Sequence, residues 1–450
     1  MLGAGRVAAP LVRYLLDRAD LELTVVDRFV ERANALVDGQ EKGRAVALLT
    51  EETDRLEELI RGHDLCVSLL PAPQHPLIAE RCIKHRRHLV TTSYISPRMR
   101  ELDGPARQAG VMLLNETGLD PGIDHMSAMR IIHDVERRGG EVVSFRSYCG
   151  GLPAPEANDN PWGYKFSWSP RAVCTAGKNA ARYRENGNLV DVPGPELFAH
   201  HHPVEVEGLG TLEAYPNRDS LSYLDLYGLQ QVHTMFRGTL RYSGWCETLK
   251  QVVDLGLLDE TPVTYPAGTT YARYLAGFLE SPPTGDLRRD LAGRLGLAES
   301  SPVLDRFEWL GLLSDEPLAV AGGESTPLDA LAERMVEKMS YGPGERDMVV
   351  LYHSFEARFP SAADERISSV LIDYGRPDGD SAMARTVGLP AAVTARLIVT
   401  GQLALPGVHL PVLPEIYKPV LAELASMGIC SAETTTPLKA RSGDRPANRR

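Results

Sequence analysis

Short apolar runs alternate with amphipathic stretches over the first 120 residues of the chain. The amphipathic stretches have the apolar spacing of helices, as in TEETDRLEELIRG, which begins with a threonine cap and an acidic first turn and ends at a glycine. Strands that alternate with helices form βαβ units around a parallel sheet whose two faces are both covered. We therefore predict an α/β fold that opens with such a sheet. The predicted strands lie at 22–27, 44–49, 64–71, 88–93 and 111–116.

The pattern changes after residue 140. Residues 141–153 are typical of a strand that runs into a glycine turn, and 153–175 are rich in Pro, Asn, Trp and Ser, which predicts irregular binding loops. Residues 246–340 have mostly helical spacing and predict a small helical region. A strand at 345–359 and a long helix at 381–401 follow, and the polar, basic C-terminal end predicts a disordered tail.

Composition narrows the class of protein. A chain of 450 residues with 43% hydrophobic residues suffices for two or three domains with buried cores. The net charge of −12 argues against a general nucleic-acid binder. We find no signal peptide and no apolar run of membrane-spanning length, so we expect a cytoplasmic protein with no membrane partner. Six scattered cysteines without a C-x-x-C pair fit reduced thiols.

The opening stretch MLGAGRVAAP carries a candidate nucleotide site. Gly3, Gly5 and Ala8 have the G-x-G-x-x-A spacing that lets a loop backbone approach a dinucleotide pyrophosphate. A helical stretch follows, and Asp27 lies where the ribose-binding carboxylate of a Rossmann-type domain is expected. An ordinary turn with an aspartate cap is the alternative. The residues predicted to bind the cofactor here are Gly3, Gly5, Arg6, Val7, Asp27 and Arg28.

Long stretches of the chain resemble one enzyme family, the glutamate-forming saccharopine dehydrogenases, also called saccharopine reductases. The resemblance is carried, in the family's order and up to about residue 425, by GAGRVAAP, DLCVSLLP, HLVTTSYISP, NETGLDPGIDH, SYCGGLPAPEANDNPWGYKFSWSPR, AYPNRDS, FRGTLRYSGW, GERDMVVL and SAMARTVGLP. It implies a Rossmann domain at 1–120 completed by 375–430, an α/β substrate and dimerisation domain at 121–245 with 341–374, a helical domain at 246–340, and a disordered tail at 431–450. It also implies a homodimer.

The resemblance bears on the first strand as well. Only Met1 and Leu2 precede the glycine loop, whereas family members have several more residues there, which form a central strand. Losing a central strand removes ladder hydrogen bonds and buried area. We therefore expect the first strand to be truncated in this sequence and the true start to lie upstream of Met1.

The family's reaction sets the chemistry to look for. A hydride passes from saccharopine, a secondary amine, to a nicotinamide, and the resulting imine is hydrolysed to glutamate and 2-aminoadipate 6-semialdehyde. Such a site needs cations for carboxylates, an acid/base for amine and water protons, and a hydride face shielded from water. No metal is expected, because Asp124 and His125 alone make no metal site and the histidines at 200–202 lie in a loop without other clear ligands.

Two arginines match the family's carboxylate-binding positions. Arg218 in YPNRDS and Arg241 in GTLRY can pair with carboxylates in a bidentate manner. Thr239 and Leu240 beside Arg241 could add a hydroxyl and backbone contacts to the substrate. Structural ion pairs in turns are the alternative for both arginines.

Further contacts follow from the ends of the predicted strands, which face the ligand crevice in an open α/β sheet. The resemblance implies substrate contacts at Ser93 and Tyr94, and at Asp120, whose alternative role is a helix N-cap. It also implies that Leu119, Asp120, Pro121 and Ser169 border the cofactor. The general acid/base stays open among Asp120, Tyr94 and Cys149, since a partly screened carboxylate or thiol can have a pKa near neutrality.

The sequence leaves more than one possibility for the cofactor and for the function. Asp27 favours NAD because a carboxylate repels the 2′-phosphate of NADP, whereas Arg28 resembles the arginine of NADP-using fungal members, so we expect NAD or NADP with a preference for NAD. One alternative function is a carboxynorspermidine-type dehydrogenase of polyamine synthesis, whose substrate would not need both arginines. The other is a non-catalytic NAD-binding scaffold, which would need only the glycine loop.

Overall fold

The computed structural model of the chain describes residues 1–279 and 284–438. The chain divides into two compact units, unit 1 with Met1–Val142 and Ala357–Arg450, and unit 2 with Val143–Glu356. The chain passes between the units inside two strands, β6 (Glu141–Pro153) and β14 (Asp347–Arg358). The three-part domain division expected from the sequence stays a prediction.

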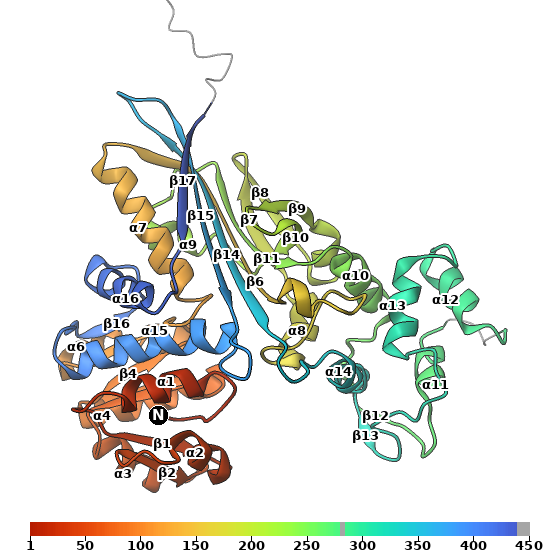
Figure 1. The fold of residues 1–450 in the computed structure, drawn as a ribbon, viewed down its shortest axis with the longest axis horizontal. Helices are drawn as coiled ribbons and strands as arrows, with labels where there is room; N and C mark the ends of the chain where they lie inside the picture. The colour runs from red at the N-terminus through yellow and green to blue at the C-terminus, as the bar shows by residue number, and fades with distance from the viewer. Residues whose placement is uncertain (280–283, 439–450) are drawn as a thin grey trace, which may run out of the picture. The chain divides into compact units, whose positions relative to one another are not determined.

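Unit 1 alternates strands and helices as the apolar pattern predicts (Figure 1). Its N-terminal part contains α1 (Ala8–Leu16), β1 (Leu23–Asp27), α2 (Val30–Val37), β2 (Gly43–Ala47), α3 (Thr53–Arg61), β3 (Leu65–Ser68), α4 (His75–His85), β4 (His88–Thr91), α5 (Pro97–Arg100), α6 (Asp103–Ala109), β5 (Met112–Leu114) and α7 (Ile123–Arg137). Its C-terminal part adds β15 (Glu365–Tyr374), α15 (Ala382–Val399), β16 (Gly407–His409), α16 (Pro414–Ser426) and β17 (Ala432–Pro437).

The strands β1–β5 and β16 of unit 1 form a parallel Rossmann-type arrangement. One sheet has the order β16-β5-β4-β3, and β1 pairs in parallel with β2. Leu2 joins the two sheets, because it bridges in parallel to Val26 of β1 and to Ser68 of β3. The expected α/β class with a Rossmann-type domain is therefore confirmed, and Met1 and Leu2 occupy the position of the strand that precedes the glycine loop. Returning residues 407–409 extend the sheet beside β5, as the resemblance implied.

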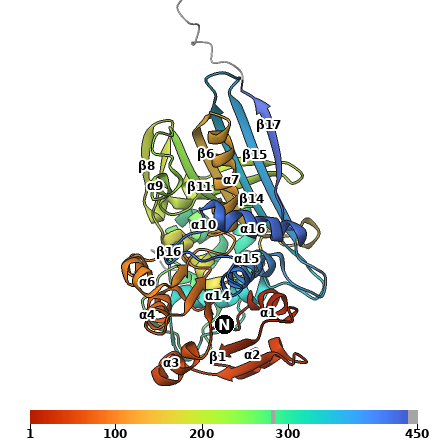
Figure 2. The ribbon, with the colours of Figure 1, turned by 90° about the vertical axis from the view of Figure 1, so that its left-hand side faces the viewer.

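The longest helix of unit 1 packs against the helix that follows the glycine loop. Figures 1 and 2 show α1 beside α15, and Gly388 of α15 permits the close approach, since a Cβ there would lie 2.6 Å from the carbonyl oxygen of Val7. Among the described residues, α15 alone is long and apolar enough to span a membrane, and 83% of it is buried inside the protein. A core helix can have the same length and composition, and α15 is such a core helix.

Unit 2 contains a mixed sheet followed by mostly helical residues, and its last residues lie in the strand β14 (Figure 1). Between β6 and β14 it contains α8 (Pro170–Thr175), β7 (Ala181–Glu185), β8 (Asn188–Val192), β9 (His202–Val206), β10 (Gly210–Pro216), α9 (Tyr223–Tyr227), β11 (Thr234–Arg241), α10 (Trp245–Leu255), β12 (Val263–Thr264), α11 (Tyr271–Ala276), α12 (Leu287–Leu295), α13 (Pro302–Leu310), β13 (Glu324–Ser325) and α14 (Pro327–Lys338). The helical pattern predicted for 246–340 is confirmed.

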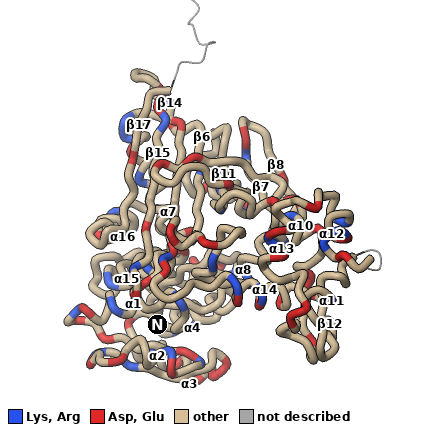
Figure 3. The backbone as a smooth tube through the Cα atoms, turned by 45° about the vertical axis from the view of Figure 1, so that its right-hand side comes forward, with Lys and Arg blue, Asp and Glu red and all other residues tan. Residues whose placement is uncertain are grey.

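The sheet of unit 2 positions the residues of interest on neighbouring strands. β6 pairs in parallel with β11, and β11 pairs antiparallel with β10, which pairs antiparallel with β9. A single core of aliphatic and aromatic side chains continues from this sheet into the helices. Figure 3 shows Lys and Arg positions interspersed with Asp and Glu positions along both units, so that ion pairs form locally.

One prediction about the C-terminal end is wrong in part. Residues 432–437, which we expected in a disordered tail, form the exposed strand β17 and pair antiparallel with β15. The run of β-branched threonines there suits a pleated edge, but its pairing partner lies more than sixty residues earlier, beyond the reach of local pattern. The remainder of the predicted tail, from 439 onward, lies outside the described residues.

Candidate active site

The glycine loop of unit 1 has the geometry of an anion site. Gly3 adopts φ +97°, and a Cβ there would lie 3.2 Å from the carbonyl oxygen of Leu69, so glycine is required at this position. A Cβ at Gly5 would meet nothing within 4 Å, which leaves space for a ligand against the backbone. Within the described residues, the N–H groups of Gly5, Arg6 and Val7 have no acceptor, and α1 begins directly after them. Free amides and a helix N-terminus together attract phosphate.

Asp27 at the end of β1 fastens this loop. Its Oδ2 accepts a hydrogen bond of 2.8 Å from Ala4 N–H, and its Oδ1 accepts one of 2.9 Å from Phe29 N–H. Both carboxylate oxygens are therefore engaged by backbone amides. Asp27 positions the loop as well as lying where a ribose contact was predicted.

Arg28 and Arg32 both pack against the aromatic ring of Phe29. The guanidinium carbons of Arg28 and Arg32 lie 4.6 Å and 4.7 Å from the centre of the Phe29 ring. Within the described residues, neither guanidinium has a carboxylate at ion-pair distance. The sequence analysis named Arg28 and missed Arg32, although the i, i+4 spacing of the two was a readable signal. Paired guanidinium groups of this kind can hold a phosphate group.

Tyr94 and Asp120 are brought together in unit 1. Tyr94 Oη donates a hydrogen bond of 2.6 Å to Asp120 Oδ1. The alternative role of Asp120 as a helix N-cap is wrong, because α7 begins at Ile123, and it is Asp124 Oδ1 that accepts the N–H of Gly122.

A buried acid–histidine pair supports the Tyr94 loop. Glu116 Oε1 accepts a hydrogen bond of 2.8 Å from the N–H of Ile95, and Glu116 Oε2 lies 2.6 Å from His125 Nε2. Both side chains are buried. Leu119 beside them is also buried, and its carbonyl oxygen accepts the N–H of Asp124, whereas the carbonyl oxygen of Pro121 accepts that of Gly118. The contacts predicted for Leu119 and Pro121 with a cofactor stay predictions.

Ser93 ends the segment after β4, as predicted. Its Oγ lies 2.8 Å from Nε2 of His75, the first residue of α4. The sequence analysis did not single out His75. The position of His75 at the start of a predicted helix does not indicate a functional role. Its hydrogen-bond partners lie on or just after two separate strands, and only the folded structure brings them together.

In unit 2, Arg241 lies inside a cage of three aromatic rings, Tyr164, Tyr215 and Trp245, which we call the aromatic cage. Its guanidinium carbon is 4.9 Å, 5.8 Å and 5.5 Å from the respective ring centres. Arg241 is 3% exposed, and its NH1 group donates a 2.7 Å hydrogen bond to the carbonyl oxygen of Leu240. Within the described residues, Arg241 Nε has no hydrogen-bond partner.

Among the described residues, no carboxylate oxygen lies at ion-pair distance from the guanidinium of Arg241. Glu213 lies opposite Arg241 in the strand register, but its carboxylate accepts the N–H groups of Gly244 and Cys246 at the start of α10. Burial raises the pKa of Tyr164 to about 12 and also raises the pKa of Tyr215, so both phenols are neutral at neutral pH. A buried guanidinium without a counter-ion is costly, and an incoming carboxylate would remove that cost.

Cys149 and Thr239 are direct neighbours on the same sheet. They face each other in the parallel register of β6 and β11, and Thr239 also pairs with Tyr215 of the aromatic cage. Cys149 is buried, and Leu240 between Thr239 and Arg241 is buried too. Cys149, Thr239 and Arg241 therefore belong to one patch of unit 2, although their predicted roles are untested.

Two predicted residues of unit 2 lie outside this patch. Arg218 is exposed, has φ +53°, and its carbonyl oxygen accepts the N–H of Arg182. Ser169 is exposed, and its Oγ accepts the N–H of Ala172, which makes it the N-cap of α8. The predicted substrate contact of Arg218 and cofactor contact of Ser169 stay predictions.

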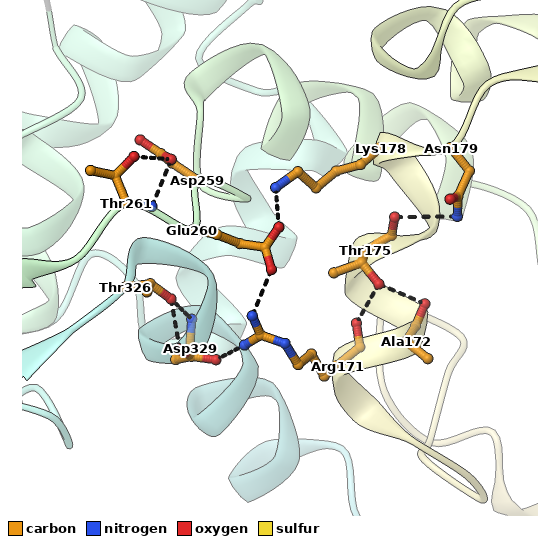
Figure 4. Close-up of polar contacts among 10 residues, drawn as sticks. All are labelled: Arg171, Ala172, Thr175, Lys178, Asn179, Asp259, Glu260, Thr261, Thr326 and Asp329. Atoms are coloured by element: carbon orange, nitrogen blue, oxygen red, sulfur yellow. Dashed lines mark hydrogen bonds and ion pairs between the residues drawn. The ribbon is translucent and has the colours of Figure 1, made fainter. Parts of the chain in front are cut away.

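An ion-pair network fixes the helix that Ser169 caps. Figure 4 shows Arg171 of α8 reaching both Glu260, at 2.6 Å, and Asp329 of α14, while Lys178 also contacts Glu260. These side chains are about half exposed, so solvent screens each pair. The network ties the irregular segment around α8 to the helical part of unit 2.

The histidines and acids of the described ranges do not gather into a metal site. Among residues 1–279 and 284–438, no group of three His, Cys, Asp or Glu side chains could hold a metal ion. Of the loop histidines at 200–202, His202 begins β9, and its Nε2 lies 3.1 Å from the Tyr148 hydroxyl.

Comparison with known proteins places the chain among relatives of one kind. Residues 1–114 match the family model described as "Saccharopine dehydrogenase NADP binding domain", and residues 118–429 match "Saccharopine dehydrogenase C-terminal domain". A Schizosaccharomyces pombe protein named saccharopine dehydrogenase [NADP(+), L-glutamate-forming] is 38% identical over 95% of this chain and 97% of its own length. Mouse mitochondrial alpha-aminoadipic semialdehyde synthase is also 38% identical, over 95% of this chain and 47% of its own length.

A solved structure agrees with these relatives. The apo saccharopine dehydrogenase (L-Glu forming) of Saccharomyces cerevisiae superimposes with a TM-score of 0.88 at 38% identity, over 97% of this chain and 98% of its own. A homospermidine synthase from Legionella pneumophila in complex with NAD has a TM-score of 0.55 at 10% identity, which shows a shared fold alone.

Proposed function

The chain belongs to the saccharopine dehydrogenase family, and we propose that it oxidises saccharopine with NADP to glutamate and 2-aminoadipate 6-semialdehyde, or runs the reverse reductive condensation, in lysine metabolism. In the oxidative direction the amine carbon loses a hydride, the imine takes up water, and the C–N bond breaks, with one proton released. The relatives named above favour this reaction over the carboxynorspermidine and scaffold alternatives.

The observation that carries the proposal is the buried guanidinium of Arg241, which has no direct ion pair among the described residues and an Nε without a hydrogen-bond partner. A guanidinium buried among neutral aromatic rings is built for a ligand that brings a carboxylate, and saccharopine brings three. Thr239 beside it can donate a hydroxyl hydrogen to the same ligand. This part of unit 2 therefore binds and orients the substrate.

Tyr94 and Asp120 are suited to the proton transfers of the reaction. Their 2.6 Å hydrogen bond lets a proton move between a phenol and a carboxylate as the substrate amine or the attacking water changes charge. Cys149 is the other candidate acid/base, and Tyr94→Phe, Asp120→Asn and Cys149→Ala separate the three. The variant that removes the acid/base is expected to lose kcat about 10²–10⁴-fold.

The residues of unit 1 fit a dinucleotide. The free amides after Gly5 and the start of α1 would hold its pyrophosphate, and the open space over Gly5 allows the approach. The bound nicotinamide would accept the hydride. We propose NADP in place of the NAD that Asp27 favoured, because both oxygens of Asp27 are engaged by amides, whereas Arg28 and Arg32 carry two guanidinium groups for a 2′-phosphate.

The experiment compares NADP with NAD on the purified protein with saccharopine. The wild type is expected to turn over faster with NADP, and Arg28→Ala with Arg32→Ala is expected to raise the KM for NADP at least tenfold while leaving the KM for NAD nearly unchanged. Arg61→Ala, an exposed arginine on α3, is the matched control and should change neither constant. Absence of turnover with either nucleotide would contradict the proposed function. The expected homodimer and cytoplasmic location stay predictions, which sedimentation and cell fractionation test.

A further inference from the structure

His75 lies in unit 1 between the carboxyl ends of two neighbouring strands. Its Nδ1 is 3.0 Å from Ser68 Oγ at the end of β3, and its Nε2 is 2.8 Å from Ser93 Oγ just beyond β4. Thr91 Oγ1 at the end of β4 is 3.0 Å from the same Nε2. The ends of parallel strands are the edge at which ligands of such sheets bind. The imidazole therefore connects the interior of the sheet to Ser93, which borders that edge.

Two buried hydroxyls, those of Ser68 and Thr91, contact the two ring nitrogens of His75. Ser68 is fully buried, and within the described residues its hydroxyl has one partner, Nδ1 of His75. A buried hydroxyl that only accepted a bond would leave its hydrogen unpaired, at a cost of about 1–3 kcal/mol. Thr91 Oγ1 is just as buried and contacts Nε2, and a neutral ring has one lone pair, so the ring accepts from Ser68 at Nδ1 or from Thr91 at Nε2 but not from both. With Ser68 as the donor, the ring hydrogen is on Nε2 and is directed at Ser93 Oγ and Thr91 Oγ1.

The same network determines what Ser93 can do. In the tautomer with the ring hydrogen on Nε2, the imidazole donates to Ser93 Oγ, and the Ser93 hydroxyl hydrogen remains available for an acceptor outside the network. His75 is itself buried at 3% exposure, and burial lowers its pKa to about 4, so the ring is neutral at neutral pH and carries one hydrogen, as the assignment requires. Both ring nitrogens are then satisfied, and the ring cannot rotate without losing a bond.

We propose that His75 is a positioning residue that holds Ser93 as a hydrogen-bond donor toward an oxygen atom of the bound ligand. The proposal rests on the proposed function, in which Ser93 contacts the substrate close to the nicotinamide. The acceptor is either a saccharopine carboxylate or the carboxamide oxygen of the nicotinamide. Both offer the same chemistry, and the two are distinguished by which ligand loses affinity.

The variants follow from the positions of the two ring nitrogens. The amide of His75→Asn can reach the place of Nδ1 but not that of Nε2, whereas the amide nitrogen of His75→Gln can reach the place of Nε2 and donate to Ser93. Ser93→Ala removes the donor itself. His85→Asn, at the other end of α4 and paired with Glu57, is the matched control for the same substitution.

We would measure the KM for saccharopine by initial rates and the Kd for NADPH by fluorescence titration. Ser93→Ala is expected to raise one of the two constants about tenfold, which is the loss of one good hydrogen bond. His75→Asn should raise the same constant by a similar factor, His75→Gln should recover most of the loss, and the double variant His75→Asn with Ser93→Ala should be no worse than Ser93→Ala. His85→Asn should change neither constant.

Several results would overturn the proposal. One is a His75→Asn variant that keeps the wild-type values of both constants, and another is a His75→Gln variant as impaired as His75→Asn. A third is a double variant whose loss equals the product of the two single losses, since His75 would then act independently of Ser93. If His75→Asn does not fold, Ser68→Ala replaces it, because it frees the tautomer without touching Ser93 and should raise the same constant by a smaller factor. A wild type that binds NADPH without oxidising saccharopine contradicts the proposed function, whereas active variants with unchanged constants contradict this inference alone.

Discussion

Replacing Arg241 by methionine separates a ligand-binding charge from a structural one. The substitution removes the guanidinium from the aromatic cage and leaves an unbranched apolar side chain in its place. The cage then loses cation–π contacts, worth about 0.5–2 kcal/mol, and one hydrogen bond to Leu240, worth about 0.5–1.5 kcal/mol. It no longer buries a guanidinium that lacks a direct ion pair, and it gains sulfur–aromatic contacts of about 0.3–1.5 kcal/mol.

These contributions nearly cancel in the free energy of unfolding but not in catalysis. We expect Arg241→Met to change the stability by less than about 1.5 kcal/mol in either direction. The loss of a charge-assisted contact to a substrate carboxylate should lower kcat/KM for saccharopine by about 2–3 kcal/mol, which is about 30- to 150-fold. Thermal or denaturant unfolding and initial rates measure the two effects on the same preparation.

Arg334→Met is the matched control. Arg334 is as buried as Arg241 and lies 4.6 Å from the Tyr271 ring centre, but it pairs with Glu316 at 2.6 Å and with Glu337 at 2.9 Å. Its loss should destabilise the protein by about 2–4 kcal/mol and leave the KM for saccharopine unchanged. The reasoning is refuted if Arg241→Met unfolds the protein as much as Arg334→Met does, or if it keeps wild-type kinetics.

Three further predictions concern unit 1. Gly5→Ala should keep the wild-type melting temperature, because its Cβ would meet no atom within 4 Å, yet raise the Kd for NADP by roughly tenfold or more in a binding titration. Gly388→Ala should destabilise by about 1–3 kcal/mol in denaturant unfolding, because its Cβ would lie 2.6 Å from Val7 O, whereas Gly104→Ala, with open space in helix α6, should not. The folded-state pKa of His75, about 4, lies below its ordinary 6.5, so its contribution to stability is present above pH 6.5 and is lost as the pH falls toward 4. That loss is about 3 kcal/mol, and unfolding curves across this range should show it in the wild type and not in His75→Gln.

Local pattern sufficed for the strands before residue 120 and for the α/β class of unit 1. The strand and helix spacings before residue 120 predict the parallel sheet, because each element there carries its own periodicity and its own stop signal. The strand β17 was missed because its only support is β15, and pairing between distant segments leaves no trace in either one.

In the candidate site too, short motifs could be predicted from the sequence, whereas contacts between distant segments could not. The glycine loop could be read from a short motif and Arg241 was named from the family resemblance, whereas the aromatic cage gathers Tyr164, Tyr215 and Trp245 from three separate segments. The preference for NAD counted the charge of Asp27 but not the two amides that its carboxylate accepts. Hydrogen bonds of that kind depend on the folded loop and cannot be read from residue type.

The central claim is tested most directly by mixing the purified protein with saccharopine and NADP, following NADPH absorbance, and identifying the products. The account predicts NADPH formation with release of glutamate and 2-aminoadipate 6-semialdehyde in equal amounts, and a slower reaction when NAD replaces NADP. A folded protein that binds NADPH and forms neither product would contradict it.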